Sequence, residues 1–145
     1  MSGLAPTSHT NPDDGVLREL LRRIRRIAVV GLSPKPLRDS HRVARYLQQQ
    51  GYEVLPVYPR EERILGQPVY RRVRDIGGGV DLVDVFRRGE ALPEVVEDAL
   101  AARAPALWFQ LGCNNEAAAA RATAAGVMLV MDRCLMVDHA RLLRR

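Results

Sequence analysis

The chain has 145 residues, 47% of them hydrophobic and 27% charged, with a formal net charge of +5 at pH 7. This length and composition predict one domain with its own hydrophobic core. No apolar run approaches the ~18 residues that a membrane span requires. The first 15 residues also lack the basic and apolar regions of a secretory signal. We therefore expect a cytoplasmic protein whose two cysteines, Cys113 and Cys134, are reduced thiols without metal-binding spacing.

The positive charge is concentrated in the first half of the chain. Residues 1–74 hold 14 Lys and Arg against 7 Asp and Glu, a net charge of +7. This excess favours a polyanionic ligand. Nucleic acid is the competing partner, but the aromatic content is only 5% and no helix-turn-helix, zinc-finger or RRM signature occurs, so it is disfavoured.

Taken in chain order, the predicted elements alternate between strands and helices. Residues 1–15, rich in Ser, Thr, Pro, Asp and Gly, are expected to form a disordered tail. Apolar runs bounded by turn residues predict strands at Ile27–Val30, Glu53–Val57, Val80–Phe86, Ala106–Leu111 and Val127–Met131, and a short edge strand at Gln67–Tyr70. Amphipathic segments predict helices at Ser40–Gln50, Pro93–Arg103, Asn114–Ala125 and Leu135–Leu143, and a short helical turn at Val73–Ile76.

This alternation predicts an α/β fold of three layers, with a mostly parallel sheet of five or six strands and helices on both faces. One domain would span residues 16–145. In such a sheet, ligands bind outside the carboxyl ends of the strands. Polar or special residues follow each strand and favour a binding crevice there; they are Gly31–Pro34, Tyr58–Arg60, Phe86–Arg88, Gln110–Gly112 and Asp132–Cys134.

The first strand ends in Gly31 and leads through a polar loop into a helix. A glycine lets the backbone approach a ligand, and the free N–H groups at a helix start attract an anion. The loop holds Ser33, Lys35 and Arg38 but lacks the later glycines of G-x-G-x-x-G. It therefore predicts a phosphate site that is not diagnostic of NAD.

The second strand also lacks the acid that a NAD site places near its end to bind the ribose. Glu53 stands at the start of this strand, and Arg60 follows its end. Arg60 would suit a ribose phosphate, which NADP carries at the 2′ position and coenzyme A at the 3′ position. A solvated surface arginine is the alternative.

Five segments in a fixed order carry a family resemblance, and their most specific parts are the runs Asp-Val-Phe-Arg and Asp-Arg-Cys-Leu-Met. The segments are Gly31–Ser33, Pro56–Pro59, Asp81–Arg87, Gln110–Gly112 and Asp132–His139. Over about Leu17–Leu143, the chain resembles the small single-domain CoA-binding proteins of bacteria. These are similar to the N-terminal CoA-binding domain of the succinyl-CoA synthetase α subunit.

The resemblance implies a Rossmann-like domain with CoA or an acyl-CoA laid across the strand ends. It implies diphosphate contacts from Gly31, Ser33 and Pro34, and nucleotide contacts from Val57 and Tyr58. The full set of predicted cofactor-binding residues is Gly31, Leu32, Ser33, Pro34, Lys35, Arg38, Val57, Tyr58, Pro59, Arg60, Phe86, Arg87, Gln110 and Gly112. Two prolines in the loop leave fewer N–H groups for the phosphates.

No nucleophile, base and orienting group converge in the sequence. The synthetase reaction needs a phosphorylated histidine from a second domain, which we do not expect in this chain. His41 is expected to be a surface imidazole or a phosphate contact. His139, beside Asp138, is expected to pack or to form a buried hydrogen bond. We expect binding without catalysis; an NADP-dependent oxidoreductase and an interaction module with a vestigial crevice stay open. A synthetase or acyltransferase subunit is the protein partner we would expect.

Cys113 precedes a predicted helix start with Asn114 or Asn115 as N-cap. The positive end of the helix dipole would favour its thiolate, which predicts a mixed disulfide with CoA under oxidising conditions. An unreactive turn residue is the alternative. Cys134, followed by apolar residues, is expected to be buried.

Overall fold

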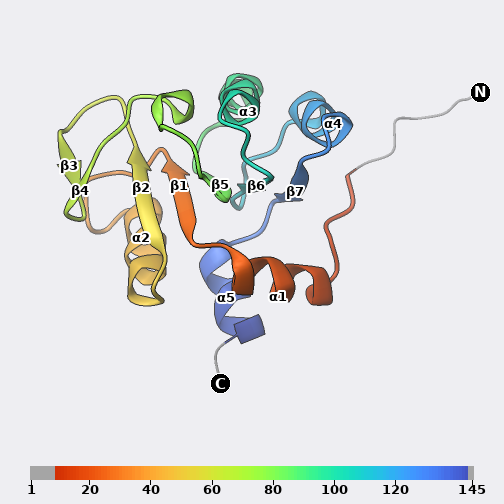
Figure 1. Cartoon of the computed structure of the whole chain (residues 1–145), viewed down its shortest axis with the longest axis horizontal. Coiled ribbons are helices and arrows are strands. Elements are labelled where there is room, and N and C mark those ends of the chain that lie inside the picture. Colours follow the sequence, from red (N-terminus) through yellow and green to blue (C-terminus); the bar gives the residue numbers. More distant parts are fainter. Residues whose placement is uncertain (1–8, 144–145) are drawn as a thin grey trace, which may run out of the picture.

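The computed structural model describes residues 9–143, and its centre is a five-stranded sheet (Figure 1). The strands are β1 (Arg26–Val30), β2 (Glu53–Val57), β5 (Leu82–Val85), β6 (Ala106–Phe109) and β7 (Met128–Met131). They lie in the order β2-β1-β5-β6-β7, and every neighbouring pair is parallel. The predicted parallel α/β sheet is confirmed.

Helices cover both faces of this sheet (Figure 1). One face carries α3 (Leu92–Ala101) and α4 (Glu116–Ala124); the other carries α1 (Asp14–Arg23), α2 (Asp39–Gln49) and α5 (Leu135–Leu143). Successive side chains of β1 alternate between the two cores: Ala28 packs in the α3 and α4 layer, and Val29 in the opposite layer. This burial on both faces explains why the strands read as continuous apolar runs. None of the helices within residues 9–143 is long and apolar enough to cross a membrane.

The helix α1 was not predicted. Asp13 caps it by accepting a hydrogen bond from the Val16 N–H at 3.0 Å, and its buried face consists of Leu17, Leu20 and Leu21. This spacing is helical, but the polar composition of the preceding residues concealed where the helix begins.

The expected tail therefore overlaps with structure. Its residues 1–8 lie outside the described residues, whereas Asp14 and Gly15 belong to α1. The Asn11 side chain donates to the Met131 carbonyl at 3.0 Å and accepts from the Met131 N–H at 2.8 Å. Asn11 thus attaches the segment before α1 to the end of β7.

The predicted edge strand Gln67–Tyr70 is divided in the structure. Gln67–Pro68 forms β4, which pairs antiparallel with β3 (Arg63–Ile64) across a turn at Leu65 and Gly66. Both turn residues have positive φ, as the tightest hairpins require. Tyr70 then forms one parallel bridge with Val57 of β2. The helical turn predicted at Val73–Ile76 is the short helix η1 (Val73–Asp75), and a second one, η2 (Gly89–Ala91), precedes α3.

Candidate ligand-binding cavity

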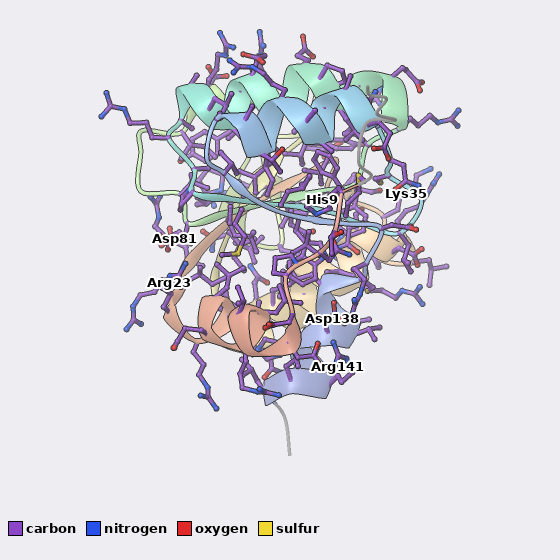
Figure 2. The ribbon with its side chains drawn as sticks, turned by 90° about the vertical axis from the view of Figure 1, so that its right-hand side faces the viewer. His9, Arg23, Lys35, Asp81, Asp138 and Arg141 are labelled. Carbon is purple, nitrogen blue, oxygen red and sulfur yellow. The ribbon has the colours of Figure 1, made fainter. Side chains whose placement is uncertain are left out.

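A cavity of about 1130 Å³ lies over the carboxyl ends of β2, β1 and β5, beside the start of α2 and the face of α3. Ten of the fourteen residues predicted to bind a cofactor line it: Gly31, Ser33, Lys35, Arg38, Val57, Tyr58, Pro59, Arg60, Phe86 and Arg87. Figure 2 shows Lys35 at this end of the sheet and Asp81 at the opposite end. The volume exceeds what a drug-sized ligand needs and suits a larger molecule.

The other four predicted residues do not line this cavity. Leu32 points into the core and is fully buried, and the Pro34 ring lies outside the lining. Gln110 is buried, and its amide nitrogen donates to Asp84 Oδ1 at 2.6 Å. Gly112 lies in the loop beyond, where its N–H donates to Asp132 Oδ1 at 2.8 Å. Gln110 instead lines a second, smaller cavity, described below.

Gly31 is required by the packing of three strand ends. Its φ is +82°, and a Cβ atom at this position would lie 2.4 Å from the Phe86 carbonyl oxygen. Its N–H donates to the Val57 carbonyl at 2.9 Å. Gly31 therefore holds the ends of β1, β2 and β5 close together, and any substitution there disturbs the fold as well as a ligand.

Hydroxyl groups accept from two of the N–H groups of the loop after Gly31, those of Ser33 and Lys35. Ser40 Oγ accepts from the Ser33 N–H at 3.0 Å, and Ser33 Oγ accepts from the Lys35 N–H at 3.1 Å. His41, expected at the surface, is buried, and its Nδ1 lies 2.9 Å from the Ser33 carbonyl, to which it donates. The loop is thus fixed from within.

The start of α2 provides further N–H groups. Those of Asp39 and Ser40, the first two of the helix, have no acceptor among residues 9–143. Such groups at a helix start attract an anion. Anion binding at this loop therefore depends on α2 and on nearby side chains more than on the loop backbone.

The cavity is surrounded by cations that have no acidic partner. Within the described part of the chain, four of them form neither an ion pair nor a side-chain hydrogen bond: Lys35, Arg38, Arg87 and Arg88. Arg60 also lines the cavity, and its guanidinium lies 6.0 Å from the centre of the Tyr58 ring. Clustered charges of one sign raise the local potential and attract a polyanion.

The far wall of the cavity was missed by the sequence analysis; it contains Arg71, Arg72, Val73, Glu90, Ala91, Glu94, Val95 and Asp98. Arg71 Nη1 donates to the carbonyls of Tyr58, Arg60 and Glu61 at 3.1, 2.9 and 2.9 Å, which fixes the loop after β2. The bridge between Val57 and Tyr70 brings this wall into place. The basic excess of residues 1–74 was its one signal in the sequence.

Asp98 holds the base of this wall. It is buried and accepts two hydrogen bonds from Arg72, at 2.9 and 2.6 Å, and one from Arg74 Nε at 2.9 Å. The hydrogen bonds to Asp98 raise the pKa of Arg72 above its ordinary value. The charge of Arg72 is therefore neutralised by Asp98, unlike the charges of the four cations that form no ion pair.

A second, smaller cavity of about 240 Å³ lies beside the first, at the ends of β5 and β6 and against α5. It shares Asp39 and Phe86 with the large cavity. Its other lining residues are mainly apolar; those at its outer side are Leu111, Cys134, Met136 and Val137.

The two cysteines exchange their predicted environments. Cys113 is buried, and burial raises the pKa of its thiol, so the expected thiolate is wrong. Asn115 is the N-cap of α4, as predicted, but desolvation outweighs the helix dipole. Cys134, expected to be buried, is half-buried and lines the smaller cavity.

Asp84 is a fully buried carboxyl in the middle of β5. Its Oδ1 accepts from Gln110, and its Oδ2 has no partner among the described residues. Burial raises the pKa of Asp84 to about 7. Asp81, directly before β5, accepts instead from the N–H groups of Arg25 and Arg26 and does not contact Asp84.

Asp138 and His139 are both buried, and His139 has the buried hydrogen-bond contact that the sequence predicted. Tyr46 Oη lies 2.8 Å from His139 Nδ1. Asp138 accepts from Arg133 at 2.7 Å and from Arg141 at 3.2 Å, and Figure 2 shows Asp138 and Arg141 together on α5. Neither Asp138 nor His139 lines either cavity.

Comparison with known proteins identifies the family. Residues 25–140 match the model of the CoA binding domain family. The chain belongs to this family. The resemblance seen in the sequence is thereby confirmed, and family membership supports a role in binding CoA.

Relatives of similar length exist in other organisms. The chain is 43% identical over 130 residues to the uncharacterized protein YneT of Bacillus subtilis, covering 90% of this chain and 96% of YneT. A solved structure of a hypothetical protein from Pyrococcus horikoshii is 40% identical, with a TM-score of 0.89 and 99% of each chain covered. A 59-residue stretch, 40% of this chain, is 42% identical to the α subunit of an ADP-forming acetate–CoA ligase of Pyrococcus furiosus, 13% of that subunit.

Proposed function

We propose that the large cavity binds CoA or an acyl-CoA and that the chain does not itself catalyse a reaction on it. The observation that carries this proposal is the group of cations without acidic partners around a large cavity, in a member of the CoA binding domain family. The cavity lies where the strand order reverses. The chain passes from β1 to β2 on one side and later returns to β5 on the other side of β1. Ligands of open parallel sheets bind at this reversal of strand order.

Each part of CoA can be matched to residues at the large cavity. In the proposed pose, Lys35, Arg38 and the first N–H groups of α2 contact the diphosphate. Arg60 contacts the 3′-phosphate, and Tyr58 offers its ring to the nucleotide. The pantetheine arm then runs past Phe86, toward the ends of β5 and β6.

The lining of the large cavity supports binding without catalysis. Among the described residues it contains no histidine or cysteine. Its buried acid, Asp98, is held by Arg72 and Arg74. In the proposal, any reaction of the bound thioester is performed by a partner, such as a synthetase or acyltransferase subunit.

The two alternatives are less well supported. An NADP-dependent oxidoreductase would use the same cations for a 2′-phosphate, but the family favours CoA; hydride transfer to a carbonyl substrate would identify it. A vestigial crevice would gain nothing from clustered like charges, which destabilise the folded state.

The test compares CoA with dephospho-CoA by calorimetry. Arg60→Ala should weaken CoA more than dephospho-CoA, by roughly 1–3 kcal/mol, because a charge-assisted bond to the 3′-phosphate is lost. Arg63→Ala is the matched control, since Arg63 is exposed three residues away and lines neither cavity. Equal weakening of both ligands would remove Arg60 from this role.

A further inference from the structure

The strand order places the smaller cavity in line with the large one. The large cavity covers the ends of β2, β1 and β5, and the smaller one those of β5 and β6. Neighbouring strands lie about 4.8 Å apart, so the two cavities follow one another along the carboxyl edge of the sheet. Phe86, at the end of β5, forms part of both walls.

The smaller cavity differs from the large one in chemistry. Four large apolar side chains are exposed within residues 9–143, and two of them, Leu111 (66% exposed) and Val137 (56%), line it. Exposed apolar side chains grouped at a cavity mark a binding surface for an apolar group. Its charged residues, Asp39 and Arg42, pair with each other, so neither is available for a charged ligand.

We infer that the smaller cavity receives the acyl chain of an acyl-CoA and that this protein prefers apolar acyl groups. This inference rests on the proposed binding of CoA in the large cavity. A ligand whose diphosphate lies at Lys35 and Arg38, with its nucleotide toward β2, directs its other end past Phe86. The acyl group at that end then contacts Leu111, Met136 and Val137.

The volume and charge of the cavity define the acyl class. The cavity volume of about 240 Å³ is the volume that roughly eight water molecules occupy in the liquid. It accommodates a short chain of methylenes. A dicarboxylic acyl group would place its free carboxylate among apolar side chains beside a cation that Asp39 already neutralises. Such a group should therefore bind less well than an apolar one of equal length.

The experiment is a calorimetric series on the full chain with CoA and with acetyl-, butyryl-, hexanoyl- and succinyl-CoA. Each buried methylene should tighten binding about two- to fourfold, so hexanoyl-CoA should bind at least about tenfold tighter than acetyl-CoA. Succinyl-CoA should bind no tighter than acetyl-CoA. The measured quantity is the ratio of each dissociation constant to that of CoA.

Two valines provide matched variants. Val137 is the third residue of α5 and lines the smaller cavity, whereas Val16 is the third residue of α1, is exposed and lines neither cavity. Val137→Asp should bring the ratio for hexanoyl-CoA close to that for acetyl-CoA. Val16→Asp should keep the wild-type ratio.

The outcomes separate this inference from the proposed function. If CoA binds but the wild type shows no increase in affinity with chain length, the inference is wrong and CoA binding stands. Retention of the full increase in Val137→Asp would also overturn it. If neither CoA nor any thioester binds, the proposed function fails, and the inference fails with it.

Discussion

The two ends of the sheet, marked by Asp81 and Lys35 in Figure 2, differ in how their charged groups are paired. At the amino end, Asp81 accepts from the N–H groups of Arg25 and Arg26 at 2.8 and 2.9 Å. The Arg26 side chain contacts Glu53 at 3.3 Å. At the carboxyl end, four cations that line the large cavity form no ion pair within the described residues: Lys35, Arg38, Arg87 and Arg88.

This contrast separates stabilising charges from binding charges. Paired groups at the amino end tie the strand starts to one another. Unpaired cations at the carboxyl end repel one another and lower the stability of the ligand-free chain. A ligand with several phosphates would reduce that repulsion, as the proposed binding of CoA at the carboxyl end requires.

The largest expected effect comes from reversing charge at the carboxyl end. In the double variant Lys35→Glu with Arg38→Glu, CoA affinity should fall at least about 100-fold, because two charge-assisted contacts worth roughly 1.5–3 kcal/mol each are lost. The midpoint of thermal unfolding should not fall. Arg45→Glu, in α2 and away from both cavities, is the calorimetric control. If Arg45→Glu lost as much CoA affinity as the double variant, the contrast between the two ends of the sheet would not hold.

A second prediction concerns Asp84, which lies between the two ends. Burial raises its pKa in the folded chain to about 7, from an ordinary value of 3.8. Between about pH 4 and pH 7 the unfolded chain loses this proton while the folded chain keeps it, so the free energy of unfolding should fall as pH rises. Asp84→Asn should remove this decline, which is on the order of a few kcal/mol.

Urea unfolding at pH 4.5 and pH 7.5 measures this effect, with Glu19→Gln in the exposed face of α1 as control. The stability of Asp84→Asn relative to the wild type should rise between the two pH values, and that of Glu19→Gln should not. Parallel pH dependence in all three proteins would show that Asp84 is ionised in the folded chain throughout.

A smaller effect is expected at the amino end. Asp81→Ala leaves the N–H groups of Arg25 and Arg26 without their acceptor, and should lower the free energy of unfolding by roughly 1–3 kcal/mol. CoA affinity should stay at its wild-type value. Urea unfolding and calorimetry measure the two quantities, with Glu19→Ala as control. A large loss of CoA affinity in Asp81→Ala would show that the two ends are not independent.

The parts of the site that depend on local pattern could be predicted from the sequence. An apolar run that ends in Gly31 and enters an amphipathic helix identified the loop of the large cavity. The far wall could not be predicted, because Arg71 reaches the loop after β2 only through the bridge between Tyr70 and Val57. The environment of Cys113 likewise depends on packing between loops distant in sequence, for which the chain gives no local signal.

The central claim is that the cations at the carboxyl end bind CoA, and native mass spectrometry of the intact chain tests it most directly. The protein, mixed with equal amounts of CoA and NADP, should show one CoA per chain, and the Lys35→Glu with Arg38→Glu variant should show none. A wild-type spectrum without a CoA-bound species, or with NADP bound in its place, would contradict the account.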